Sequence, residues 1–144
     1  MAFFDFFTSD IAIDLGTANT LIIAHDKVMV DEPSIVAIDR KTEKVIAVGK
    51  RAMQMHEKTH ENIKTIRPLR DGVIADFQAA ESMIRGMISM IFPKNKLFKP
   101  SLVMVICIPS GITEVEKRAV KDSAEQAGAR EAYLIHEPMA AALG

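Results

Sequence analysis

The sequence has no tryptophan, one cysteine and one tyrosine among its 144 residues. A single cysteine cannot form an internal disulfide framework or a cysteine-rich metal site, and it fits a reducing cytosol. The 18 lysines and arginines nearly balance the 19 aspartates and glutamates, whereas nucleic-acid-binding domains usually carry a basic excess. The composition therefore predicts a globular domain that does not bind nucleic acid and is stabilised by burial of its apolar residues.

Long apolar runs are also missing, since none reaches the roughly 18–20 residues that a membrane-spanning helix needs. The N-terminus lacks the pattern of a secretory signal, because Asp5 interrupts its short apolar stretch and no lysine or arginine precedes Lys27. The first seven residues nevertheless hold four of the seven phenylalanines, which are Phe3, Phe4, Phe6 and Phe7. Their spacing predicts that residues 1–10 form an amphipathic segment that attaches to a membrane surface.

A second apolar pair, Leu97 and Phe98, lies in a predicted loop between Lys96 and Lys99. The flanking cations suit anionic lipid headgroups, so we expect Leu97 and Phe98 to contact the membrane as well. The same residues could instead pack against the domain or against a neighbouring subunit, and the sequence leaves this open.

Apolar periodicity predicts the order of elements in the first half of the chain. The predicted elements are a hairpin over 11–16 and 20–24, a strand over 27–30 that Glu32 and Pro33 end, a hairpin over 34–39 and 44–48, a helix over 49–56, an irregular segment over 60–69, a turn over 70–72 and a brief strand over 73–75. Asp76 then suits the N-cap of a helix that runs to about Phe92. Its predicted buried face is Phe77, Ala80, Met83, Ile84, Met87, Ile88 and Ile91.

The second half begins with the continuously apolar segment 102–108, which predicts a strand covered on both faces, with Cys107 buried in it. Thr113 and Glu116 match a capping box, and Gly128 ends the helix that they begin. A strand over 132–136 and a helix opened by Glu137 follow. Together these elements predict an α/β fold in which helices flank a mixed sheet.

The turn from Gly16 to Asn19 has the residue types of an anion-binding turn. Gly16 lets the backbone approach a ligand closely, and successive N–H groups in such a turn can bind phosphate. Thr17 and Asn19 add neutral donors, and Asp14 before the turn could hold Mg²⁺ through its water shell. A plain β-turn with a polar tip fits the same residues, so this short pattern alone leaves nucleotide binding open.

The segment from His56 to His60 matches the H-E-x-x-H pattern, in which two histidines bind zinc and the glutamate is a general base. The segment is polar and has no apolar face to bury, and the other histidines, His25 and His136, lie in other elements. We therefore predict a solvated loop here and no zinc site.

Longer blocks of the sequence resemble the MreB family of bacterial actin homologues. These blocks are 14–20, 31–37, 66–77, 108–113 and 136–142, and the resemblance runs from Asp10 to Gly144. It implies an actin-like (ribonuclease H-like) fold with a small β/α insertion. Subdomain IA would comprise residues 11–33 and 76–144, subdomain IB would comprise residues 34–75, and the second half of the family fold would be absent.

The resemblance also implies a function, namely a bacterial cytoskeletal protein that binds and hydrolyses ATP with Mg²⁺. Such a protein polymerises into filaments at the cytoplasmic side of the inner membrane and guides cell-wall synthesis with membrane proteins of wall elongation. Asp14 would then hold the metal, Gly16, Thr17, Ala18 and Asn19 would bind phosphate, and Glu137 would orient or activate the attacking water. The residues alone, without the resemblance, favour a different interpretation, in which Glu137 is a first-turn acid that only complements its helix dipole.

Two other functions fit parts of the sequence. An Hsp70-like chaperone ATPase shares the phosphate hairpin and the Glu-Pro-x-Ala-Ala-Ala turn, and a truncated module could bind filaments without catalysis. The resemblance further implies a chain more than twice this length, in which the remainder supplies a second phosphate loop and the adenine pocket. We therefore expect the 144 residues to be an N-terminal fragment that alone binds ATP weakly or not at all and has no ATPase activity.

Overall fold

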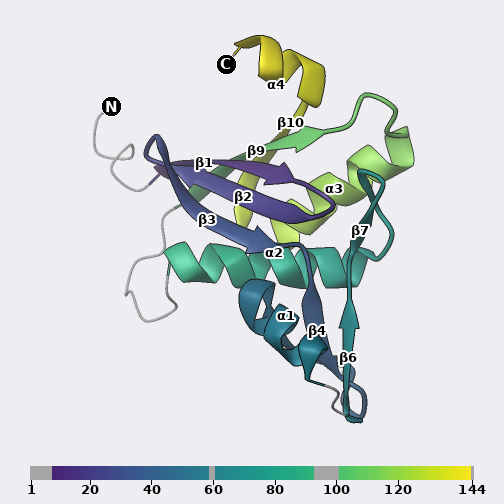
Figure 1. Ribbon diagram of the computed structural model, residues 1–144. Helices are drawn as coiled ribbons and strands as arrows, with labels where there is room; N and C mark the ends of the chain where they lie inside the picture. The colour runs from purple at the N-terminus through teal and green to yellow at the C-terminus, as the bar shows by residue number, and fades with distance from the viewer. Residues whose placement is uncertain (1–7, 59–60, 93–100, 144) are drawn as a thin grey trace.

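A five-stranded mixed sheet forms the centre of the protein (Figure 1). The computed structural model describes residues 8–58, 61–92 and 101–143. Strands lie in the order β10-β9-β1-β2-β3, and their bounds are β1 (Thr8–Leu15), β2 (Asn19–Ala24), β3 (Lys27–Pro33), β9 (Ser101–Ile108) and β10 (Ala129–His136). Strands β1, β9 and β10 are parallel, whereas β2 and β3 pair in antiparallel fashion. This topology confirms the predicted α/β class and its mixed sheet.

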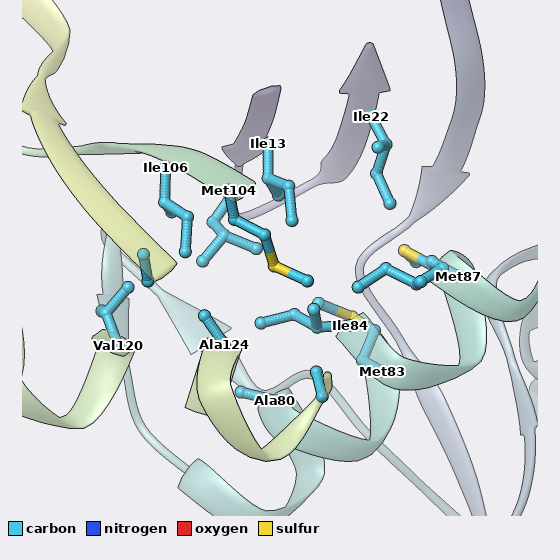
Figure 2. Close-up of a cluster of buried hydrophobic side chains, with 14 of the residues drawn as sticks. Ile13, Ile22, Ala80, Met83, Ile84, Met87, Met104, Ile106, Val120 and Ala124 are labelled. Carbon is cyan, nitrogen blue, oxygen red and sulfur yellow. The ribbon is translucent and has the colours of Figure 1, made fainter. Parts of the chain in front are cut away.

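The main core lies between one face of this sheet and the helices α2 (Phe77–Ile91) and α3 (Glu114–Gln126). Residues alternate along each strand, so every second side chain points toward the helices. Figure 2 shows Ile13, Ile22, Met104 and Ile106 of the strands above Met83, Ile84 and Met87 of α2 and Val120 and Ala124 of α3. The period-two pattern of the strands and the 3–4 spacing of α2 therefore converge on one apolar layer.

Replacing Met104 with alanine is expected to lower the free energy of unfolding by about 2–5 kcal/mol, because the cavity left in a packed core adds to the lost burial. The Met104 side chain is fully buried at 0% exposure, whereas Met139 is 59% exposed. Met139→Ala is the matched control and should change stability by less than about 0.5 kcal/mol. Urea denaturation of both variants measures the difference, and equal losses would contradict this core assignment.

The two long helices begin at the predicted caps. The Asp76 carboxylate accepts the N–H of Ala79 at 2.9 Å. The Thr113 hydroxyl accepts the N–H of Glu116, while the Glu116 carboxylate accepts the N–H of Thr113 at 2.7 Å. This capping box lowers the pKa of Glu116, because the backbone N–H and hydroxyl of Thr113 donate to the charged carboxylate. The expected caps of α2 and α3 are thus confirmed.

A smaller lobe is inserted between β3 and α2. It contains a three-stranded sheet in the order β5-β4-β6, with β4 (Val36–Asp39), β5 (Val45–Val48) and β6 (Ile63–Ile66), and the helix α1 (Gly49–Glu57). Its own small core is Ile35, Ala37, Ala47 and Ala52. A two-stranded ribbon of β7 (Leu69–Arg70) and β8 (Val73–Ile74) leads back to α2. Figure 1 shows this lobe on the far side of α2 from the main sheet.

Two local predictions in this region were wrong. The segment predicted as irregular over 60–69 contains β6. Backbone hydrogen bonds to β4 stabilise this strand, although its four residues lack a clear strand pattern. The third strand, predicted over 27–30, is not broken by Glu32 and Pro33 but continues through Pro33. A proline is tolerated there because β3 is an edge strand and needs no further N–H donor on its outer side.

Three predictions of burial were also wrong. Only one face of β9 is buried, and Val105 on its other face is 37% exposed. Cys107 lies on that open face and is therefore only half-buried. Phe77, the first residue of α2, is 41% exposed, and Ala79 takes a buried position instead. Val105 and Cys107 lie on the face of β9 that α2 and α3 do not cover, and Phe77 lies at the N-terminal end of α2.

Candidate functional site

Three parallel strands end at one edge of the main sheet and place acidic side chains there. Asp14, near the end of β1, lies opposite Cys107 of β9, which in turn lies opposite Ile135 of β10. Glu137 directly follows β10 and is the first residue of α4 (Glu137–Leu143), whose predicted start is thereby confirmed. Both Asp14 and Glu137 are exposed. In open α/β sheets, ligands bind at the carboxyl ends of the parallel strands.

The strand register places Asp14 and Glu137 on either side of β9, near Cys107. Burial raises the pKa of Cys107, and the negative charges of Asp14 and Glu137 raise this pKa further, since each opposes a thiolate. Residues separated by more than 120 positions in sequence are thus brought to one place by the strand order. The two acids that the sequence singled out for different roles thus lie at the same edge of the sheet.

The turn from Gly16 to Asn19 connects β1 to β2 at this same edge. A Cβ atom added at Gly16 would lie 2.4 Å from the carbonyl oxygen of Asn19. That distance is too short for any side chain, and the obstacle is backbone rather than a flexible side chain. The turn is therefore compact enough that only glycine fits at its first position.

Two buried hydroxyl groups hold this turn from below. The Ser34 hydroxyl donates to the carbonyl oxygen of Gly16 at 2.6 Å, and the Ser34 N–H donates to the carbonyl oxygen of Ala18 at 2.8 Å. The Thr20 hydroxyl lies 2.9 Å from that of Ser34, and both side chains are fully buried. Sequence reasoning gave no role to Thr20 or Ser34. The available signal was a hydroxyl residue inside β2, at Thr20, and another directly after β3, at Ser34.

The side chains of the turn are themselves hydrogen-bonded to other segments. The Asn19 amide donates to the Asp31 carboxylate at 2.9 Å, so one of its two N–H groups is engaged. The Thr17 hydroxyl oxygen accepts the N–H of Gly72 at 3.0 Å and keeps its own proton available for donation. Asp31 and Gly72 border the inserted lobe on either side. The segment that leads into the inserted lobe and the segment that leads out of it therefore both form hydrogen bonds with the turn.

Part of the H-E-x-x-H segment lies within the described residues. Helix α1 ends at Glu57, and Lys58 is its C-cap. The Nδ1 of His56 lies 2.5 Å from the Thr65 hydroxyl. His56 and Glu57 are exposed in the last turn of α1 rather than in the predicted loop, and residues 59–60 lie outside the described residues. Within the described part, no group of three metal-binding side chains occurs.

The candidate membrane residues lie outside the part of the chain that the structure describes. They are Phe3, Phe4, Phe6, Phe7, Leu97 and Phe98. Among the helices of the described segments, none combines the length and the apolar character required to cross a bilayer.

Known proteins resemble this chain over nearly its full length. The family model described as "MreB/Mbl protein" matches residues 8–144. The cell shape-determining protein MreB of Haemophilus influenzae is 50% identical over 143 residues, which cover 96% of this chain and 40% of that protein. The cell shape-determining protein Mbl of Bacillus subtilis is 48% identical over 139 residues, with 96% and 41% covered. The chain thus spans about two-fifths of the length of these relatives.

Solved structures share the fold. A crystal structure of MreB5 of Spiroplasma citri bound to AMPPNP has a TM-score of 0.77 and 38% identity, and it covers 94% of this chain and 40% of that one. The ADP-bound form of the same protein has a TM-score of 0.75 and 39% identity, with 90% and 38% covered. A double helical filament of MamK, at 19% identity, TM-score 0.73 and coverage of 91% and 41%, supports the actin-like fold alone.

Proposed function

This chain belongs to the MreB/Mbl family, and we propose that it forms the ATP-binding N-terminal part of an actin-like protein that determines cell shape. One observation carries the proposal: Asp14, the compact turn over 16–19 and Glu137 meet at the carboxyl edge of the sheet. The nucleotide-bound crystals of Spiroplasma citri MreB5, which share this fold, support it.

Each group at the edge has a distinct task in this proposal. The backbone N–H groups of the turn bind the phosphates, because successive N–H groups form an anion-binding concavity. The Glu137 carboxylate holds the attacking water in line, since phosphoryl transfer depends mainly on positioning and charge stabilisation. Glu137, at the start of α4, is exposed to solvent, so a water molecule could reach its carboxylate.

Asp14 fits a magnesium site of the kind found beside nucleotides. Mg²⁺ prefers oxygen ligands, keeps several waters and is usually held by one or two carboxylates together with substrate phosphates. The exposed Asp14 carboxylate meets that need, and the described residues offer no larger acidic cluster that would compete for the ion. The bound ion would neutralise negative charge on the phosphates.

The remaining parts of the proposal follow from the family. We propose that residues 11–33 and 76–144 form subdomain IA and that residues 34–75 form the insertion IB. The whole protein would polymerise at the cytoplasmic side of the inner membrane. It would attach to the lipid through Phe3, Phe4, Phe6, Phe7, Leu97 and Phe98. There it would guide cell-wall synthesis together with membrane proteins of wall elongation.

Sedimentation tests this function on the full-length protein that contains the chain. We expect MgATP to shift the protein into the high-speed pellet, and vesicles with anionic lipid to retain it in a flotation assay. Titration calorimetry of the isolated 144 residues should give weak or no MgATP binding, because a compact nucleotide site needs the other half of the fold. Micromolar affinity of the isolated chain would contradict the half-site proposal.

The chaperone alternative makes the opposite prediction in the same preparation. An Hsp70-like ATPase would stay in the supernatant with MgATP, and unfolded peptide would stimulate its hydrolysis. A pelleting response without peptide stimulation supports the filament function. Peptide stimulation without pelleting would overturn it.

A further inference from the structure

The hydrogen bonds around Ser34 have a determined direction. A carbonyl oxygen cannot donate, so the single hydroxyl proton of Ser34 is used on the carbonyl of Gly16. The contact between the hydroxyls of Thr20 and Ser34 at 2.9 Å must therefore be donated by Thr20. The result is a relay in which Thr20 donates to Ser34 and Ser34 donates to Gly16. Every polar side-chain atom of this buried pair is satisfied.

This relay decides which way the peptide units of the turn face. Ser34 engages the carbonyl oxygens of both Gly16 and Ala18, through its hydroxyl and its backbone N–H. In a planar trans peptide the C=O and the following N–H point in opposite directions. The N–H groups of Thr17 and Asn19 therefore face away from Ser34. This is the orientation that an anion-binding turn requires.

Ser34 is itself held in place from the side of the inserted lobe. The Glu32 carboxylate accepts the N–H of Lys50 at 2.6 Å, at the start of α1. The N–H of Gly49 donates to the carbonyl of Ile35 at 3.0 Å. The residues on both sides of Ser34 are thus anchored to α1.

We propose that Ser34, supported by Thr20, is a positioning residue that fixes the phosphate-binding turn in its ligand-ready conformation. The inference rests on the proposed nucleotide function of that turn. Ser34 does not touch the ligand, because it is fully buried beneath the turn. Its hydrogen bonds keep the carbonyl oxygens of Gly16 and Ala18 turned away from the phosphates. In the opposite orientation, these partly negative oxygens would repel the negative charge of the phosphates.

The test measures nucleotide affinity in variants of the full-length protein. Ser34→Ala removes the donor to Gly16, and Thr20→Val removes the donor to Ser34 with little change of shape. Thr20→Ser keeps the hydroxyl and is the rescue variant. Ser123→Ala is the matched control, because Ser123 is also buried but lies on α3. The readouts are the dissociation constant for MgATP and the rise in melting temperature that saturating MgATP produces.

We expect Ser34→Ala to raise the dissociation constant about tenfold and Thr20→Val about threefold, with Thr20→Ser and Ser123→Ala near the wild type. A merely structural role would lower the melting temperature without nucleotide but leave the dissociation constant unchanged, and that result would overturn the inference while the proposed function stands. If the wild type fails to bind MgATP, the proposed function and this inference both fail. If Ser34→Ala does not fold, the comparison of Thr20→Val with Thr20→Ser decides alone, and equal affinities would overturn the inference.

Discussion

Replacing Gly16 with alanine is expected to weaken MgATP binding by the full-length protein at least about 100-fold. The new Cβ would lie 2.4 Å from the carbonyl oxygen of Asn19, so the turn must open and its N–H groups must move. Hydrogen bonds to a charged group contribute about 1.5–3 kcal/mol each, and the loss of two of them corresponds to this factor. Fluorescence titration with a labelled ATP analogue measures the change.

Gly111→Ala provides the matched control for this substitution. Gly111 lies in the exposed turn after β9, and a Cβ there would meet no heavy atom within 4 Å. We therefore expect Gly111→Ala to bind MgATP like the wild type. Circular dichroism should show that both variants keep their secondary structure. Normal binding by a folded Gly16→Ala protein would mean that the turn does not bind the phosphates.

The features that sequence reasoning predicted well are those that neighbouring residues determine. The alternation along 11–16 sets the buried face of β1, and the Thr113 and Glu116 pair forms its capping box without help from distant residues. Gly128 adopts a φ of +116° and ends α3 as its residue type indicates. Local chemistry was sufficient in each case.

The features that were missed depend on contacts between distant segments. Strand β6 exists because β4 is there to pair with it, although Lys64 and Thr65 interrupt its apolar pattern. Ser34 reaches Gly16 across 18 positions, and Gly72 reaches Thr17 across 55. No spacing rule connects such pairs. The candidate site was therefore predicted as a set of residues, Asp14, the turn and Glu137, but the support beneath the turn became visible only in the fold.

Removing the carboxylate of Glu137 is expected to lower the ATP turnover number of the full-length protein about 100-fold or more while KM for ATP stays near the wild-type value. General-base or water-orienting groups contribute about 10²–10⁴-fold, and Glu137 acts on water rather than on nucleotide binding. Glu137→Gln and Glu137→Ala, assayed for phosphate release at saturating MgATP, measure this effect. A parallel rise in KM would instead indicate a role in binding.

The competing explanation, that Glu137 only complements the dipole of α4, is tested by Glu114→Ala. Glu114 is likewise an exposed first residue of its helix, so a dipole role predicts similar small effects for both residues.

The single cysteine gives a second readout that needs no nucleotide. Because the charge of Glu137 raises the pKa of Cys107, Glu137→Gln should shift the pH profile of thiol alkylation to lower pH, whereas Glu114→Ala should not. An unchanged profile would show that the Glu137 carboxylate does not lie near the Cys107 thiol, and unchanged turnover would remove Glu137 from the hydrolytic mechanism.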